Sequence, residues 1–398
     1  MKTLYLHIGT PKTATTAIQF FCGDNETLLN AKGYAYPRFG NHYRYISEWR
    51  NAHFLIGEKS GDSEQQDFEK RDQVVQECFE KIYKLFEEYD NIILSDEGLW
   101  NAGNWHDWRI WRIIQNELKK EVFTVKVIVY LRRQDEFLYS RWNQQIKTAF
   151  ESAYARYARS WDEMLANVPR QMVDYYGTLK KISEFVGKEN ITVRKFDRKE
   201  FFGGSIYADF LNIVGLKFTD EFKIQEDIRN VSLTKNDTEI KRILNGLSEN
   251  NGKYNSFFRE CLTTCSREYP DDNRYNMFSK QEMRKFLSKF QEGNQKIAKE
   301  YFDSKEPLFS SEYKAKEKWT PKNPAMFEDV IRFAGSMVIE LLKQNQKLKV
   351  RLDNHRMEIR KAKERLENQR KEIRKLKERL DKLEKLQKRA AQKDSDTK

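Results

Sequence analysis

The 398-residue chain has little that could cross-link it, break its helices or carry it through a membrane. It contains four cysteines, seven prolines and five histidines. Four cysteines exclude a dense disulfide scaffold, and 17 glycines with seven prolines exclude a collagen-like chain. No histidine or second cysteine pair lies near Cys261 and Cys265 to complete a zinc site. No run of about 20 apolar residues occurs, so no transmembrane helix is expected.

The beginning of the sequence gives no sign of secretion. The apolar stretch within residues 1–9 is too short for the hydrophobic region of a signal peptide, and it runs into a Gly/Pro turn. We therefore expect a cytoplasmic protein with reduced thiols.

The net charge is concentrated at the end of the chain. The whole sequence carries +12 at pH 7, and residues 336–398 hold 21 Lys and Arg against 11 Asp and Glu. The remaining 52 basic and 50 acidic residues leave the segment 1–335 nearly neutral. A nearly neutral body gives no argument for nucleic-acid binding. Contact with a membrane surface or another polyanion is expected only from the basic tail.

Apolar runs alternate with helical patterns over the first 335 residues. Strands are expected at residues 3–8, 91–95, 123–131 and 191–196. Helices are expected between and after them, at residues 68–88, 137–146, 175–186 and 207–214, with a first helix starting at Lys12. Continuous apolar strands separated by helices predict an α/β fold with a central parallel sheet flanked by helices on both faces.

Residues 336–392 follow a heptad pattern. One column contains Val338, Asn345, Leu352, Ile359, Leu366, Ile373 and Leu380. The second column contains Leu341, Leu348, His355, Ala362, Gln369, Leu376 and Leu383. Branched residues and Asn345 in the first column, with mainly Leu in the second, favour a parallel coiled-coil homodimer. The alternative is a single long charged helix. Residues 393–398 are expected to be disordered.

The segment after the first expected strand has the chemistry of a phosphate-binding loop. It reads His7-Ile8-Gly9-Thr10-Pro11-Lys12-Thr13-Ala14-Thr15-Thr16. A helix N-terminus offers unpaired amide protons and the positive end of its dipole, and Lys12 adds a full charge. The hydroxyls of Thr13, Thr15 and Thr16 add further donors. The loop lacks the glycine spacing of a Walker A motif, and the alternative is an ordinary strand–helix turn.

A second candidate segment follows the expected strand at 123–131. Arg132 and Arg133 lie at its carboxyl end, where ligands of α/β proteins bind, and Ser140 comes eight residues after Arg132. An arginine fork with a hydroxyl suits a phosphate monoester. The alternative is a surface arginine pair in salt bridges.

Together the two segments resemble the two signatures of sulfotransferases that use 3′-phosphoadenosine 5′-phosphosulfate (PAPS). In that family a Pro-Lys-(Ser/Thr)-x-Thr-Thr loop holds the 5′-phosphosulfate. A strand ending in Arg, with Ser eight residues on, holds the 3′-phosphate. Ala14 stands where glycine is frequent. The runs 6–19, 130–145 and 230–233 are similar to bacterial members that sulfate carbohydrates, and Asn230 and Ser232 match an Asn-x-Ser-Leu loop of the family.

The resemblance implies a P-loop-kinase-like sulfotransferase fold for residues 1–335. It also implies direct in-line transfer of the sulfuryl group from PAPS to a hydroxyl of a glycan or glycolipid, without a metal. The implied cofactor-binding residues are Lys12, Thr13, Ala14, Thr15, Thr16, Arg132, Ser140, Asn230 and Ser232. Lys12 is also the implied catalytic cation at the departing oxygen.

The general base is left open among three residues. Glu97 comes just after the expected strand at 91–95, and it is the favoured candidate. His53 is the main rival because histidine titrates near neutral pH, and His42 is a third candidate. The alternatives are a helix-capping role for Glu97 and a buried structural role for His53.

Four tryptophans follow Glu97 at positions 100, 105, 108 and 111. Their flat faces suit sugar rings, although the spacing of Trp108 and Trp111 is more typical of a core. Two other functions compete with sulfuryl transfer. One is a nucleotide kinase, against which the missing Walker A glycines argue. The other is a non-catalytic scaffold in which the coiled coil is the function.

Overall fold

The computed structural model describes most of the chain and divides it into two compact units, residues 1–329 and 330–398. The described residues are 2–43, 46–57, 68–105, 108–148, 159–224, 232–247, 253–270, 275–310, 313 and 317–395. The predicted boundary at residue 335 lies six residues beyond this division.

Five described strands form one parallel sheet in the first unit. They are β1 (Thr3–His7), β2 (Tyr34–Ala35), β3 (Asn91–Ser95), β4 (Thr124–Leu131) and β5 (Ile191–Lys195). The order across the sheet is β2-β3-β1-β4-β5, and every neighbouring pair is parallel. The α/β architecture predicted from the alternating pattern is confirmed. The chain moves first to one side of β1 and then to the other, which makes the carboxyl end of β1 a topological switch point.

Both faces of the sheet are covered because its central strands carry buried apolar side chains on both sides. In β3, Ile92 and Leu94 point into one buried cluster, and Ile93 points into another on the opposite face. Successive strand residues face opposite sides, so a continuous apolar run requires helices on both.

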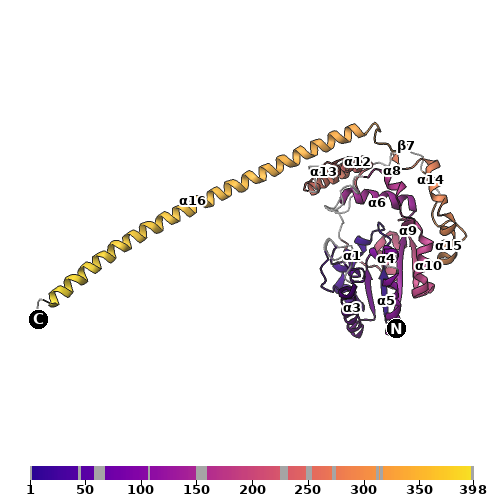
Figure 1. The fold of residues 1–398 in the computed structure, drawn as a ribbon, viewed down its shortest axis with the longest axis horizontal. Coiled ribbons are helices and arrows are strands. Elements are labelled where there is room, and N and C mark those ends of the chain that lie inside the picture. Colours follow the sequence, from indigo (N-terminus) through magenta and orange to yellow (C-terminus); the bar gives the residue numbers. More distant parts are fainter. Residues whose placement is uncertain are drawn as a thin grey trace. The chain divides into compact units, whose positions relative to one another are not determined.

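Helices from separate parts of the chain cover the two faces (Figure 1). The first face buries apolar residues of α3 (Phe68–Glu88), α4 (Gly98–Trp105), α5 (Arg109–Leu118), α10 (Tyr175–Val186) and α15 (Gln291–Phe302). The second buries those of α1 (Thr15–Asp24), α2 (Glu26–Ala31) and α11 (Ile206–Ile213). Short 3₁₀ turns are η1 (His53–Leu55), η2 (Lys188–Asn190) and η3 (Phe202–Gly204).

A third cluster lies away from the sheet and is rich in tryptophan. Trp142, Trp161 and Trp319 pack there with Phe278 and Met283. The elements of this region are α6 (Gln134–Thr148), α8 (Trp161–Ala166), α9 (Arg170–Val173), α12 (Lys235–Asn245), α13 (Asn255–Glu268), α14 (Lys280–Ser288), β6 (Tyr275–Asn276) and β7 (Glu317–Lys318). Figure 1 shows α6, α12 and α13 beyond the end of the sheet that lies opposite the N-terminus.

The structure corrects one predicted helix start. The helix expected from Lys12 begins at Thr15, because Lys12 and Ala14 have φ values of 69° and 58°, in the left-handed region. Residues in that region cannot continue a right-handed helix. Residues 12–14 are therefore loop.

The second unit is the greater part of α16 (Met326–Ser395), one uninterrupted helix of 70 residues. Its heptad columns include exposed apolar side chains from Val338 to Leu383, among them Leu352, Leu366 and Leu376. Residues 393–395, predicted to be disordered, are the last of this helix, and 396–398 lie outside the described residues. Among the described residues, no helix combines the length and apolar character needed to cross a bilayer.

Candidate functional site

The loop after β1 is hydrogen-bonded to the last part of β4, which extends further than β1. The amides of Ile8 and Thr10 donate to the carbonyls of Ile128 and Tyr130 at 3.1 and 2.9 Å, and the amide of Tyr130 donates to the Gly9 carbonyl at 2.7 Å. The Thr10 hydroxyl also donates to the Tyr130 carbonyl, at 3.0 Å. These bonds fix the loop at the carboxyl ends of the central strands.

Glycine at position 9 lets a neighbouring strand approach this loop. Gly9 has a φ of +101°, and a Cβ placed on it would meet Cβ of Glu97 at 3.1 Å. Any side chain would therefore push the loop away from the residues that follow β3. Glu97, predicted as the general base, thus lies directly beside the predicted phosphate-binding loop.

Two other cations, Arg132 and Lys147, lie close enough to Lys12 to affect its charge. Its Nζ donates to Oε1 of Gln144 on α6 at 3.1 Å. Burial lowers the pKa of Lys12 to about 8, and the charges of Arg132 and Lys147 act in the same direction against the opposing charge of Glu97. An anion brought into this surrounding would stabilise the ammonium form. The loop therefore has the electrostatics of an anion site.

The other predicted loop residues surround Lys12. Thr13 and Thr15 are buried, and the hydroxyl of Thr13 donates to the Thr10 carbonyl at 2.5 Å. Thr15 and Thr16 begin α1, whose N-cap is Ala14. The Thr13 hydroxyl is thus used within the loop, and α1 begins three residues after Lys12.

Arg132 leaves the carboxyl end of β4, as predicted. Its guanidinium lies 5.7 Å from the ring centroid of Phe196 and makes a 3.4 Å bond to Glu136. The hydroxyl of Tyr175 donates to the Arg132 carbonyl at 2.8 Å, which fixes the backbone. The guanidinium of Arg132 is therefore stacked on Phe196, and Arg132 lines a cleft at this end of the sheet.

Helix α6 borders both the loop of Lys12 and a cleft. Glu136, Ser140, Gln144 and Lys147 recur at helical spacing, and Gln144 is the residue that reaches Lys12. Glu136, one turn before Ser140, and the adjacent Tyr139 line a cleft of about 540 Å³ together with Arg132. The helix thereby connects the loop of Lys12 with the cleft of Arg132.

The cleft of Arg132 mixes aromatic and charged walls. Its aromatic residues are Tyr139, Tyr275, Phe278 and Tyr313. Its cations are Arg132, Arg133, Lys199 and Lys235, and its carboxylates are Asp135, Glu136 and Asp197. Flat rings beside cations suit a base joined to an anionic group.

The predicted Asn-x-Ser-Leu loop is represented by its second half. Asn230 lies outside the described residues, and Ser232 is exposed. Asn143 on α6, which is buried, donates to the Leu233 carbonyl and to the Thr238 hydroxyl, both at 2.7 Å. Ser232 therefore lies just before a segment that is bonded to α6 one turn beyond Ser140.

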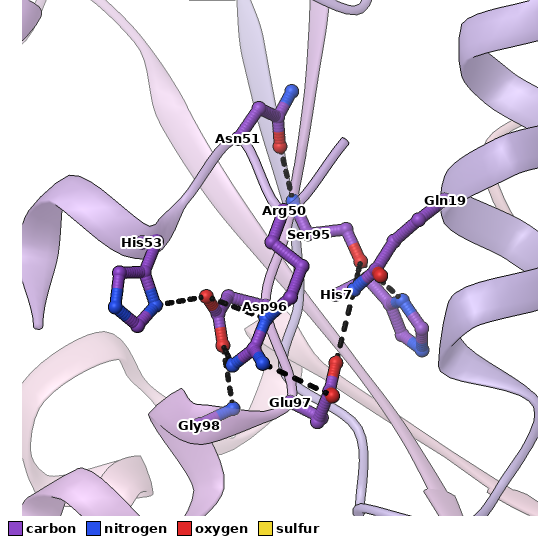
Figure 2. Close-up of polar contacts among 9 residues, drawn as sticks. All are labelled: His7, Gln19, Arg50, Asn51, His53, Ser95, Asp96, Glu97 and Gly98. Atoms are coloured by element: carbon purple, nitrogen blue, oxygen red, sulfur yellow. Dashed lines mark hydrogen bonds and ion pairs between the residues drawn. The ribbon is translucent and has the colours of Figure 1, made fainter. Parts of the chain in front are cut away.

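A buried polar network surrounds the end of β3 (Figure 2). Asp96 is fully buried and accepts from Nη2 of Arg50 at 2.5 Å, Nδ1 of His53 at 2.8 Å and the Gly98 amide at 2.6 Å. Burial alone would raise the pKa of Asp96, but the hydrogen bond from His53 and the charge of Arg50 outweigh it and hold the pKa below its ordinary value. Asp96 is a fixed anion of the network.

The two candidate bases occupy different places in this network. Glu97 accepts from Nε2 of Gln19 at 3.0 Å and lies 3.5 Å from Nη1 of Arg50. His53 donates to Asp96, and its ring packs edge-on against Tyr43 with centroids 4.8 Å apart. Glu97 contacts the loop of Lys12, whereas the contacts of His53 are with Asp96 and Tyr43. The third candidate, His42, is exposed.

Behind Glu97, the same network reaches β1. Gln19 also donates to the Ser95 hydroxyl at 3.2 Å, and that hydroxyl lies 2.9 Å from Nδ1 of His7. Burial lowers the pKa of His7 to about 3, against the opposing charge of Asp96, so this ring is neutral. His7 and Ser95 form a neutral support for Gln19.

Several of these residues were not predicted from the sequence. Gln144 follows Ser140 by one helical turn, and that spacing could have pointed to it. Gln19 and Arg50 carry no comparable signal, because they meet Glu97 only after distant segments pack together. The same holds for Asn143 and its contact with Leu233.

The three tryptophans after Glu97 whose side chains the structure describes do not form an exposed platform. Trp100 and Trp111 are buried in the core on the first face of the sheet, and Trp108 packs partly buried against it. The side chain of Trp105 lies outside the described residues. The core alternative, made for Trp108 and Trp111, is confirmed for Trp111, while Trp108 is only partly buried; Trp100 is a further core residue. Within the described ranges, no three His, Cys, Asp or Glu side chains are gathered as a metal site.

Comparisons with known proteins add a partial relative without an assigned activity. No protein-family model and no solved structure matches the chain. An uncharacterized protein of Archaeoglobus fulgidus is 29% identical over 198 residues, which is 47% of this chain and 48% of the relative. The chain therefore spans about half the length of the curated relative it matches.

Proposed function

We propose that the first unit is a PAPS-dependent sulfotransferase that acts on a carbohydrate hydroxyl. The observation that carries the proposal is the position of Lys12 and Arg132 at the carboxyl ends of neighbouring strands. Lys12 lies in the loop after β1, and Arg132 follows β4. The switch point beside β1 is where an α/β sheet binds a ligand, and two cations there suit a nucleotide with phosphates at both ends.

The finer fold proposal follows from the same arrangement. A parallel sheet of order β2-β3-β1-β4-β5, with an anion loop between β1 and α1, supports a P-loop-kinase-like sulfotransferase fold. The left-handed φ of Ala14, 58°, fits the family position where glycine is frequent.

The positions of the residues support separate roles for them in the reaction. The bond between the acceptor oxygen and sulfur forms while the bond between sulfur and the bridging phosphate oxygen breaks. Lys12 would stabilise the negative charge on the departing oxygen. Glu97, held by Gln19 and Arg50, would take the proton of the attacking hydroxyl. The cleft beside Arg132 would hold the nucleoside end.

The structure favours Glu97 over His53 as the base in this proposal. Glu97 packs against Gly9 in the loop that contains Lys12. His53 is engaged by Asp96, and its role would be to position that carboxylate together with Arg50. The acceptor, a glycan or glycolipid, would approach from the side of Glu97.

The proposal is tested by nucleotide binding, which needs no acceptor. Adenosine 3′,5′-bisphosphate (PAP), the product nucleotide, is titrated calorimetrically into the wild type, Lys12→Ala and Arg132→Ala. Loss of a charge-assisted phosphate contact should weaken binding by about tenfold or more in each variant. Lys126→Ala, on β4 but far from the loop, is the matched control. Equal affinity in all four proteins would remove both cations from the site.

We further propose that α16 pairs in parallel with a second copy of the chain. Its exposed apolar columns are the observation behind this proposal. One flanking column is almost wholly basic, with Lys349, Arg356, Lys363, Arg370 and Lys377. An antiparallel pair would place this column against itself. A parallel pair instead brings Glu358 to Lys363, Glu372 to Lys377 and Arg379 to Glu384 of the second copy, and these three attractive pairs outnumber the two repulsive ones, Arg351 with Arg356 and Arg365 with Arg370.

Cross-linking distinguishes the two orientations. A cysteine in the core column at Leu376 faces its own copy only when the helices are parallel and in register. Oxidised Leu376→Cys should therefore form a disulfide-linked dimer of twice the 47.8 kDa chain mass. The control is Lys371→Cys, on the outer face of the helix. Light scattering of the wild type that gives a monomer mass would contradict the pairing.

A further inference from the structure

Lys235 is a buried cation in the wall of the cleft that Arg132 also lines. It is the first residue of α12 and is 9% exposed. Its Nζ lies 5.4 Å from the ring centroid of Tyr139, the residue just before Ser140 on α6. Lys235 thus approaches, from a different helix, the stretch of α6 that contains the predicted phosphate-binding serine.

The backbone around Lys235 is fixed on both sides. The Thr234 hydroxyl caps α12 by accepting from the Asp237 amide at 3.1 Å, and the Thr234 amide donates to the Ser266 hydroxyl at 3.0 Å. The Ser266 hydroxyl donates in turn to Asp237 at 2.5 Å. With the bonds of Asn143 to Leu233 and Thr238, these contacts tie the start of α12 to α6 and α13. The backbone that carries Lys235 is therefore fixed before any ligand arrives.

The carboxylates beside this cleft are largely engaged by arginines. Asp135 accepts two bonds from Arg133, at 2.8 and 3.0 Å. Glu136 lies 3.4 Å from Arg132 and 3.5 Å from Arg133. The cleft thus combines a stacked guanidinium with a buried ammonium, which suits a compact, doubly charged group such as a phosphate monoester.

We propose that Lys235 binds the 3′-phosphate of the nucleotide together with Arg132 and sets the preference for 3′-phosphorylated nucleotides. This inference rests on the proposed sulfotransferase function and adds a specificity-determining residue to it. Nothing in the sequence motifs points to Lys235. Its assignment comes from burial, its place over Tyr139 and the shared cleft.

The test compares two nucleotides that differ only in the 3′-phosphate. PAP and adenosine 5′-phosphate are titrated calorimetrically into the full-length wild type, Lys235→Met and Lys199→Met. Lys199 lines the same cleft but is exposed, so its substitution makes an equal charge change at a solvated position. We expect Lys235→Met to lose about ten- to a hundredfold of the preference for PAP, and Lys199→Met to lose threefold or less.

The ratio of the two affinities separates recognition from a structural role. If Lys235→Met weakens both nucleotides equally, Lys235 only supports the fold and the inference is wrong. If it changes neither affinity, the inference is also wrong, although the proposed function stands. A wild type that binds neither nucleotide defeats the proposed function itself. Should Lys235→Met fail to fold, Lys235→Arg should keep the preference and Lys235→Gln should lose it; equal preference in these two overturns the inference.

Discussion

The Nζ of Lys12 lies 3.1 Å from Oε1 of Gln144, so the loop after β1 is bonded to the helix after β4. Arg132 lies two residues before the start of that helix, and Ser140 lies one turn before Gln144. The two segments that resemble the sulfotransferase signatures are therefore joined through one side chain. This contact places the proposed phosphosulfate and 3′-phosphate sites on a common support.

The affinity for PAP should fall as the pH rises. Only the protonated form of Lys12 attracts an anion, and its pKa is lowered to about 8 in the protein. Between pH 7 and pH 9 the protonated fraction falls about tenfold, while the phosphates of PAP are already ionised. Calorimetry across this range should show a matching loss of affinity. Lys12→Arg stays charged, so it should bind PAP with almost equal affinity at pH 7 and pH 9. An equal loss of affinity with pH in the wild type and in Lys12→Arg would contradict the role of Lys12 in binding PAP.

Replacing Asp96 should destabilise the first unit strongly. Asp96→Asn removes the charge that compensates Arg50 and replaces one of the two acceptor oxygens, which serve Arg50, His53 and the Gly98 amide, by a donor in a fully buried place, which costs about 3–5 kcal/mol. The native pKa lies below the ordinary value of 3.8, so the contribution of Asp96 is present above that value and is lost as the pH falls through the native pKa. Thermal and urea unfolding measure the loss. The exposed Asp220→Asn should stay within about 0.5 kcal/mol of the wild type.

Replacing Ala14 by glycine should not destabilise the protein. A non-glycine residue at φ 58° carries a steric cost of about 1 kcal/mol, which offsets the greater freedom of glycine in the unfolded chain. Ala17→Gly, within α1, is the control and should lose about 0.5–1 kcal/mol. Urea denaturation of both variants provides the comparison. Equal losses would mean that Ala14 is not in the left-handed conformation.

The identity of the base can be separated from nucleotide binding. Glu97→Gln should bind PAP as the wild type does, because the predicted role of Glu97 is toward the acceptor. An acceptor is first identified from a glycan panel. With that acceptor and PAPS, the rate at which Glu97→Gln forms PAP should be about 10²- to 10⁴-fold lower than the rate of the wild type. His53→Gln should lose far less. A large loss in His53→Gln with near-normal turnover in Glu97→Gln would move the base to His53.

The sequence predicted the main strands well because their apolar runs are long and sharply bounded. The strand expected at 91–95 is β3 as observed, since Asp90 and Asp96 flank it. The helices predicted at 68–88 and 175–186 also have the observed bounds. Strand β2 was missed because Tyr34–Ala35 is too short to show any alternation.

The site was predictable only where its residues share a local pattern. Lys12 and Arg132 could be found because each follows an apolar strand directly. Arg50 could not, because it lies in an irregular segment and meets Asp96 through tertiary contact alone. The start of α1 was misplaced by three residues because a positive φ leaves no mark when the residues are lysine and alanine.

The most direct measurement of the central claim is a calorimetric comparison of PAP with ATP on the wild-type protein. PAP is titrated without added metal, and ATP is titrated with and without Mg²⁺. The account predicts micromolar or tighter binding of PAP that does not depend on metal, with ATP binding at least about tenfold more weakly. A preference for ATP with Mg²⁺ would contradict the account and favour a phosphoryl transferase. Binding of neither nucleotide would favour a scaffold whose working part is α16.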